Sequence, residues 1–151
     1  GKSGMLVAWE AMKRVGPSGR VVGNVYLAED AATLAGLGLC HEVVVADATK
    51  PVALLDAVLA ANGGTEYDVV FNCVNVQNTE MSSILPCRQE GTVYFFSMAT
   101  HFGKAALGAE GVGKDVTMIV GNGYAKGHAD LTLAGLRENA KLRHLFETRY
   151  V

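Results

Sequence analysis

The chain has 151 residues, of which 50% are hydrophobic, 19% are charged and 7% are aromatic. This composition excludes an intrinsically disordered chain, and the length suits one domain with a core of its own. Thirteen Lys and Arg residues against fifteen Asp and Glu residues give a formal net charge of −2, which argues against a nucleic-acid-binding protein. No apolar stretch approaches the roughly 20 residues that cross a bilayer, so we expect no membrane partner.

The cysteines indicate a reducing compartment. There are three of them, Cys40, Cys73 and Cys87, widely spaced and odd in number, and no secretory signal precedes them. We therefore expect a cytoplasmic protein without a disulfide framework. The four histidines are scattered and no Cys-x-x-Cys pair is present, so the sequence predicts no metal site.

Apolar, β-branched runs alternate with amphipathic segments along the chain. In chain order we expect a helix over residues 5–15, a strand over 20–27, a helix over 29–39, a strand over 42–47, a helix over 51–62, a strand over 68–74, a short helix over 79–87, strands over 92–98 and 116–121, and a helical pair from about 128 to 151.

The expected strands are continuous apolar runs, which is typical of a parallel sheet covered by helices on both faces. Repeated β-α-β units imply right-handed crossovers. The sequence therefore predicts an α/β fold with a doubly wound parallel sheet of the Rossmann type.

One strand of that fold is missing from the expected elements. Gly1-Lys2-Ser3-Gly4 leads directly into a helix, whereas a strand normally precedes such a loop. A doubly wound sheet without its central first strand would be divided into two half-sheets. We therefore expect residues 1–151 to be a fragment of a longer protein, with the missing strand supplied upstream.

The opening Gly1-Lys2-Ser3-Gly4 segment has three interpretations. It matches the end of Gly-x-Gly-x-x-Gly, where Gly1 lets the backbone approach a pyrophosphate, Gly4 lets the helix pack closely, and the helix N-terminus attracts the phosphates. It also matches the end of Gly-x-x-x-x-Gly-Lys-[Ser/Thr], with Lys2 on phosphates, Ser3 on magnesium and Asp47 as the second magnesium-side residue. The third interpretation is a plain glycine turn.

The residues that follow the strands favour the dinucleotide interpretation. Cofactors bind across the carboxyl ends of several strands in such sheets, and here these ends are small and polar. The candidate cofactor-binding residues are Gly1, Lys2, Ser3 and Gly4; Asp47, Ala48 and Thr49; Asn72, Cys73, Val74 and Asn75; Ser97, Met98 and Ala99; and Gly121 and Asn122.

Cofactor preference between NAD and NADP stays open. The ribose-binding acid of dinucleotide-binding folds follows the second strand, about 20 residues after the last glycine. Residues 23–26 stand there, with Glu29 and Asp30 a few positions later and no arginine for a 2′-phosphate.

No catalytic acid or base can be assigned from the sequence. The candidates for proton transfer are Glu80, His101, Lys104, Glu110, Tyr124 and His128. His101 and Lys104 follow an expected strand on its carboxyl side, where they would face a substrate, and a solvated loop is the alternative.

Seven segments taken together resemble a known enzyme family. They are residues 1–4 (GKSG), 39–49 (LCHEVVVADAT), 72–76 (NCVNV), 79–82 (TEMS), 91–100 (GTVYFFSMAT), 109–115 (AEGVGKD) and 121–124 (GNGY). In these segments the chain resembles the L-erythro-3,5-diaminohexanoate dehydrogenases of anaerobic lysine fermentation. The resemblance spans essentially the whole chain.

The resemblance implies NAD-dependent oxidative deamination of an amino-acid substrate, 3,5-diaminohexanoate, to 5-amino-3-oxohexanoate. That family is similar to medium-chain dehydrogenases, in which a separate amino-terminal domain contributes much of the substrate site. Residues 1–151 would then be the dinucleotide-binding domain of a two-domain enzyme, with the upstream substrate domain as its partner. A homodimer is compatible with this arrangement. A nucleoside-triphosphate-binding module of the P-loop type is the alternative.

Overall fold

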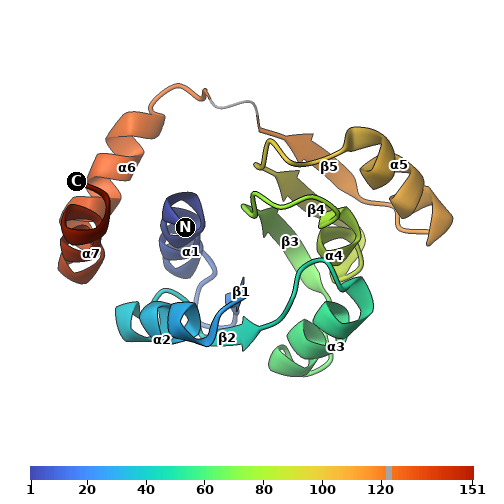
Figure 1. The fold of residues 1–151 in the computed structure, drawn as a ribbon, viewed down its shortest axis with the longest axis horizontal. Coiled ribbons are helices and arrows are strands. Elements are labelled where there is room, and N and C mark those ends of the chain that lie inside the picture. The colour runs from blue at the N-terminus through green and yellow to red at the C-terminus, as the bar shows by residue number, and fades with distance from the viewer. Residues whose placement is uncertain (122–123) are drawn as a thin grey trace.

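The structure is a computed structural model, and it describes residues 1–121 and 124–151. Helices and parallel strands alternate along the described chain (Figure 1). The elements are α1 (Lys2–Arg14), β1 (Val22–Val25), α2 (Ala28–Leu37), β2 (Glu42–Val45), α3 (Pro51–Ala61), β3 (Tyr67–Asn72), α4 (Glu80–Ile84), β4 (Cys87–Phe95), α5 (Phe102–Gly111), β5 (Thr117–Val120), α6 (His128–Glu138) and α7 (Ala140–Tyr150).

The strands form two separate parallel sheets, one with the order β1-β2 and the other with the order β3-β4-β5. Val22 pairs with Glu42 in the first sheet, and Phe71 pairs with Tyr94 in the second. In a doubly wound sheet a central strand lies between the strands that here are β1 and β3. The division into two half-sheets therefore agrees with the prediction that the first strand is absent from this chain.

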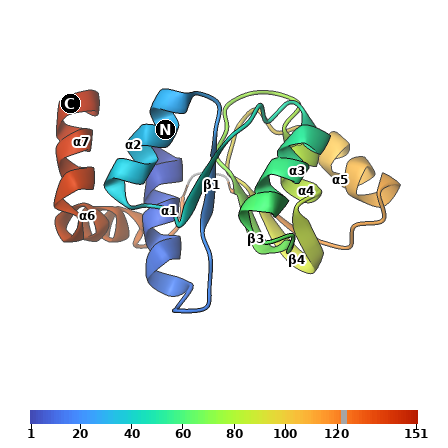
Figure 2. The same cartoon turned by 90° about the horizontal axis from the view of Figure 1, so that it is seen from below.

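Helices lie on both sides of the strands. Figure 2 shows α1 and α2 on one side and α3, α4 and α5 on the other. The first sheet is contacted by both α2 and α3. A Cβ atom built on Gly23 would lie 2.8 Å from the Cys40 sulfur and 3.4 Å from Leu34 Cδ1 of α2, so β1 needs glycine where α2 and the loop before β2 pack against it.

Two hydrophobic clusters hold the chain together. In the first, Phe95 and Val93 of β4 pack with Ile84 of α4 and with Ala105 and Ala109 of α5. Ala105 and Ala109 are one helical turn apart, so they face the sheet from the same side of α5. The second cluster joins α1, α2 and α7 and includes Met5, Leu39 and Leu142, of which Leu39 and Leu142 are fully buried.

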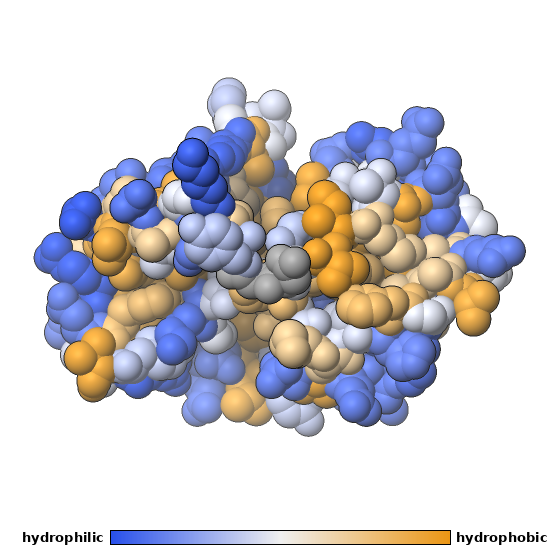
Figure 3. Space-filling view, turned by 90° about the horizontal axis from the view of Figure 1, so that it is seen from above, coloured by the Kyte–Doolittle hydropathy of each residue, from blue (hydrophilic) through white to orange (hydrophobic). Residues whose placement is uncertain are grey.

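One face of the second sheet differs from the expectation that helices cover both faces. Val69, Phe71 and Ile119 are between 43% and 48% exposed on it, and the Phe71 ring lies 5.8 Å from that of Tyr94. Figure 3 shows hydrophobic side chains gathered on the half of the molecule that carries this sheet. The described residues leave this face uncovered because α6 and α7 pack beside α1 instead.

Three expectations about the elements need correction. The first helix begins at Lys2 and not near Met5, because the Met5 amide already donates a helical hydrogen bond to the Gly1 carbonyl. The short helix expected over 79–87 ends at Ile84, since Pro86 has no N–H with which to continue it. Helix α5 was not among the expected elements, and Lys104 lies in its first turn and not in a solvated loop.

None of the described helices has both the length and the apolar character needed to span a membrane.

Candidate functional site

The N-terminus of α1 lies at the carboxyl end of β3. A Cβ atom built on Gly4 would be 3.8 Å from the Cβ of Cys73, which immediately follows β3. That distance is an ordinary van der Waals contact. The helix therefore lies beside the end of the strand, but not so closely that only glycine would fit at position 4. Burial raises the pKa of the Cys73 thiol.

The first turn of α1 is suited to an anion. Gly1 is its N-cap, no side chain caps it, and the turn holds no acidic residue. The amides of Lys2, Ser3 and Gly4 therefore have no partner within the helix. Unpaired amides and the positive end of the helix dipole together attract phosphate groups.

Lys2 does not take the position that a phosphate-transfer loop requires. Its ammonium group lies 5.1 Å from the centre of the Tyr150 ring in α7, in a cation–π contact. The lysine of a nucleoside-triphosphate loop reaches the phosphates instead. This geometry favours the dinucleotide interpretation of residues 1–4.

At the end of β2, Asp47 is held by its own turn. Its Oδ1 atom accepts hydrogen bonds from the Thr49 hydroxyl at 2.7 Å and from the Thr49 amide at 2.8 Å. These hydrogen bonds hold the pKa of the Asp47 carboxyl below its ordinary value. The next carbonyl, that of Ala48, accepts a 2.6 Å hydrogen bond from Ser82, which ties this turn to α4.

At the end of β3, Asn72 is buried and shapes the loop that follows. Its Nδ2 atom donates to Thr79 Oγ1 at 3.0 Å and to Ser83 Oγ at 2.9 Å, and its Oδ1 atom accepts from the Val74 amide at 3.0 Å. The Asn72 side chain is thus occupied by the protein. The other sequence-predicted residues here, Cys73, Val74 and Asn75, follow Asn72 in the loop after β3.

At the end of β4, the Ser97 hydroxyl accepts a 3.1 Å hydrogen bond from the Ala99 amide. Met98, between them, has a relative exposure of 96%. These three candidates therefore form a short turn with a projecting apolar side chain. Gly121 directly follows β5, and Asn122 lies outside the described residues.

A small cavity of about 250 Å³ lies beyond the ends of β3 and β4. Its lining comes from the loop before α4 and from the turn between β4 and α5: Gln77, Asn78, Glu80, residues 98–101 and Lys104. The structure thus brings together three of the six candidates for proton transfer, Glu80, His101 and Lys104.

The other three candidates lie elsewhere. Glu110 is near the far end of α5. Tyr124 and His128 contact each other edge to face, with ring centres 5.1 Å apart, before and at the start of α6.

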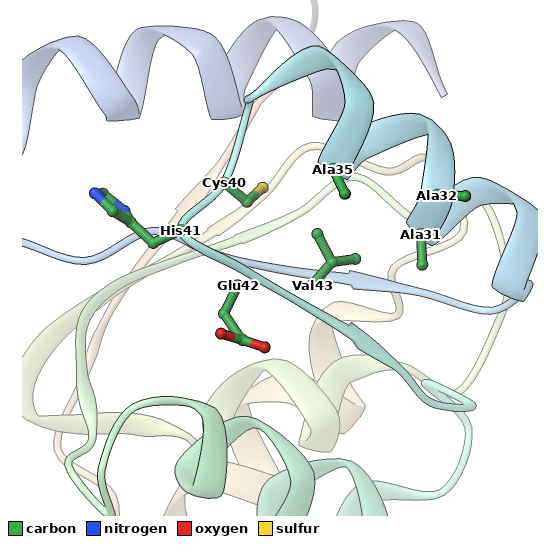
Figure 4. Close-up of a pocket in the computed structure, with 7 residues that line it drawn as sticks. All are labelled: Ala31, Ala32, Ala35, Cys40, His41, Glu42 and Val43. Atoms are coloured by element: carbon green, nitrogen blue, oxygen red, sulfur yellow. The ribbon is translucent and has the colours of Figure 1, made fainter.

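A second hollow, of about 490 Å³, lies away from this edge, where α2 faces the start of β2 (Figure 4). Alanines line its helical side, and the Cys40 and His41 side chains point in different directions (Figure 4). His41 Nδ1 accepts a hydrogen bond of 2.9 Å from the Val21 amide. Over residues 1–121 and 124–151, no three His, Cys, Asp or Glu side chains come close enough to hold a metal ion.

Two acids near the end of β1, Glu29 and Asp30, lie a few positions beyond the place where a ribose-binding acid was expected from the sequence. β1 ends at Val25, and α2 begins only two residues after Tyr26, so that Glu29 and Asp30 occupy its first turn. Both carboxyl groups therefore belong to the region just beyond the carboxyl end of β1. The short β1–α2 loop, already expected from the sequence, brings them there.

The fold is that of Rossmann-type nucleotide-binding domains. The chain is similar to a mycobacterial quinone oxidoreductase with a TM-score of 0.61 and 20% identity, covering 97% of this chain and 42% of that one. It is also similar to the nucleotide-binding subdomain of the enoylreductase domain of PpsC from Mycobacterium tuberculosis, with a TM-score of 0.52 and 17% identity, covering 97% and 92% of the two chains. A further mycobacterial structure, complexed with NADPH, matches with a TM-score of 0.51 and 17% identity over 97% of this chain and 53% of that one.

Two curated relatives are much more similar in sequence. L-erythro-3,5-diaminohexanoate dehydrogenase from Acetoanaerobium sticklandii is 62% identical over all 151 residues, and the enzyme of the same name from Fusobacterium nucleatum subsp. nucleatum is 60% identical over the same length. The chain spans 44% of the length of each. No protein-family model matches the chain. The resemblance seen in the seven sequence segments is thereby confirmed.

Proposed function

We propose that the chain is the dinucleotide-binding part of a two-domain enzyme that oxidatively deaminates L-erythro-3,5-diaminohexanoate to 5-amino-3-oxohexanoate with NAD. The observation that carries this proposal is the identity of 62% and 60%, over the full chain, to two dehydrogenases of that name. The same identity supports the proposal that the enzyme acts in the lysine fermentation that the resemblance implies.

The residues of the carboxyl edge fit a dinucleotide. The uncapped first turn of α1, free of acids, suits the pyrophosphate. The turns after β2, β3 and β4 leave Asp47, Asn75 and Ser97 near the same edge, and their short polar groups suit the ribose and carboxamide. A nicotinamide held by these residues would supply the acceptor for a hydride from C3 of the substrate.

The reaction balances in two steps. Loss of hydride from C3, and of a proton from nitrogen, converts the C–N single bond to an imine. Water then adds to the imine carbon and ammonia leaves, which gives the 3-oxo product. The part of this chain is to bind and orient the cofactor beside the substrate, while the partner domain completes the substrate site.

The negative charges at the start of α2 favour NAD over NADP. Glu29 and Asp30 lie in the first turn of α2, just after β1, where a 2′-phosphate would meet them. Residues 21–49 contain no lysine or arginine that would pair with that phosphate. An acid at this position hydrogen-bonds a free 2′-hydroxyl and repels a phosphate.

The division of the sheet supports the two-part architecture. β1 and β3 each pair on one side only within the described chain. We propose that a strand from the upstream part of the enzyme lies between them and completes one sheet, because unpaired strand edges in a sheet interior leave backbone groups without partners.

The experiment is a comparison of the full-length enzyme with residues 1–151 alone. The full-length enzyme should release ammonia from 3,5-diaminohexanoate and reduce NAD in equal amounts, and NADH should raise its melting temperature. Failure to bind NADH would refute the nucleotide site. Full turnover by residues 1–151 alone would refute the two-part architecture.

A further inference from the structure

The small cavity beyond β3 and β4 carries two charged groups that the cofactor site does not use. Its volume, about 250 Å³, lies below the range of pockets that hold whole drug-sized ligands. It is therefore too small for a whole dinucleotide and large enough for one end of a small molecule.

Glu80 supplies the negative charge. It is 3% exposed, and its Oε1 atom accepts a 2.7 Å hydrogen bond from the His101 amide. Within residues 1–121 and 124–151, no cationic group comes within 4.0 Å of its carboxylate, and no hydrogen bond reaches Oε2. A buried carboxylate with one hydrogen bond is costly unless a cation or further donors join it.

Lys104 supplies the positive charge. It stands in the first turn of α5, and its ammonium group donates a 2.5 Å hydrogen bond to Asn78 Oδ1. Asn78 is one of two described non-glycine residues with a positive φ, 65°, so the loop accepts backbone strain where it holds the lysine. Lys104 forms none of the ion pairs found in the described part of the chain. Glu80 and Lys104 therefore line one cavity without pairing with each other.

We propose that this cavity binds the amino-acid end of the substrate, with Glu80 holding an ammonium group and Lys104 a carboxylate. The inference rests on the proposed function, since it takes the substrate to be a 3-amino acid. In such a molecule a single carbon atom, C2, separates the carboxyl carbon from C3, the carbon that bears nitrogen. One ligand of this kind can therefore present both charges to the same small cavity. Binding there holds C3 at the edge of the sheet where β3 and β4 end.

The test uses the full-length enzyme saturated with NADH and measures binding by calorimetry. The probes are 3-aminobutanoate, which carries both charges, butylamine, which carries the ammonium group alone, and butanoate, which carries the carboxylate alone. The variants are Glu80→Gln, whose amide oxygen still accepts from His101, and Lys104→Gln. Asp56→Asn on α3 and Lys141→Gln on α7 are exposed controls that remove the same charges elsewhere.

The expected results differ between the two variants. Glu80→Gln should raise the Kd of 3-aminobutanoate and butylamine about tenfold or more and leave that of butanoate unchanged, whereas Lys104→Gln should weaken 3-aminobutanoate and butanoate but not butylamine. The controls should bind all three probes as the parent does. Equal Kd values for parent and variants would overturn the inference, as would the same loss in the controls.

Two further readouts separate this inference from the proposed function. NADH affinity and turnover of 3,5-diaminohexanoate by the parent enzyme test the function, and neither depends on the probes. Turnover with no effect of either variant on probe binding overturns the site alone. The melting temperature shows whether Glu80→Gln folds, and if it does not, the butanoate titration of Lys104→Gln, which changes an exposed side chain, decides the outcome.

Discussion

The side-chain amide of Asn72 lies 2.9 Å from the hydroxyl of Ser83, and this contact joins the end of β3 to the middle of α4. With the hydrogen bonds to Thr79 and from Val74, it leaves the Asn72 side chain bonded at both its nitrogen and its oxygen. The loop at the proposed cofactor site thus depends on a residue that does not face the ligand.

Replacing Asn72 should therefore affect stability and binding together. Asn72→Ala leaves buried polar partners unpaired, so we expect the free energy of unfolding to fall by about 1–3 kcal/mol and NADH affinity to fall as well. Asn75→Ala, at an exposed position in the same loop, should lower NADH affinity without loss of stability. Urea denaturation and NADH titration of both variants test this, and an Asn72→Ala protein of parental stability would contradict it.

A negative charge in the first turn of α1 should have opposite effects on folding and binding. Ser3→Asp places a carboxylate at the positive end of the helix dipole, so it should stabilise the fold by about 0.3–1 kcal/mol. The same charge should repel the pyrophosphate and weaken NADH binding about tenfold or more. Ser3→Ala serves as the control without charge. Tighter NADH binding by the aspartate variant would be incompatible with a pyrophosphate at this turn.

Removing the acids after β1 should change cofactor preference. In the double variant Glu29→Gln and Asp30→Asn, we expect the ratio of the Kd for NADPH to that for NADH to decrease, because two charges that oppose the 2′-phosphate are gone. The measurement is fluorescence titration of the full-length enzyme with each cofactor. An unchanged ratio would mean that the 2′ position of the ribose lies away from α2.

Tyr67 should make stability depend on alkaline pH. Its hydroxyl donates a 2.6 Å hydrogen bond to the Val58 carbonyl, and burial raises its pKa to about 12. Because the folded state favours the protonated phenol, this contribution is complete below the unfolded pKa of about 10 and is lost as pH rises towards 12. Tyr67→Phe should cost about 1 kcal/mol at neutral pH and remove the last step of the tyrosinate absorbance titration. Retention of that step in Tyr67→Phe would assign it to another tyrosine.

Gly91 and Gly36 provide a matched pair of glycine substitutions. A Cβ atom on Gly91 in β4 would lie 2.6 Å from the Cys87 sulfur and 2.9 Å from the Arg88 carbonyl oxygen, whereas one on Gly36 in α2 would meet nothing within 4 Å. We expect Gly91→Ala to destabilise the protein by about 1–3 kcal/mol and Gly36→Ala to stabilise it by about 0.5–1 kcal/mol. Thermal unfolding measures both, and equal effects would show that packing at Gly91 does not govern the result.

The parallel sheet was predictable from the sequence because its strands are unbroken apolar runs. Helix α5 was not, because Gly103, Gly108 and Gly111 obscure its periodicity and weaken its intrinsic propensity. Its helical form depends on burial of Ala105 and Ala109 beside β4, and such tertiary contacts leave little trace in a local pattern.

The candidate site, too, was predictable only in part. The polar residues after each strand could be located, since carboxyl ends of parallel strands share one edge. The sequence could not show which of these side chains are already hydrogen-bonded within the protein. The partners of Asn72 are seven and eleven residues further along the chain, and only the folded position of α4 brings them to it. The sequence likewise could not show that Glu80 and Lys104 line the same cavity, because this depends on the path of the turn before α5.

The two hydrophobic clusters have no residue in common: one is built on β3–β5 with α4 and α5, and the other on α1, α2 and α7. Each is thus a candidate for an independent cooperative folding unit. A strand between β1 and β3 would hydrogen-bond to both half-sheets at once and couple their unfolding. Residues 1–151 alone should therefore melt in two steps, and the complete sheet in one.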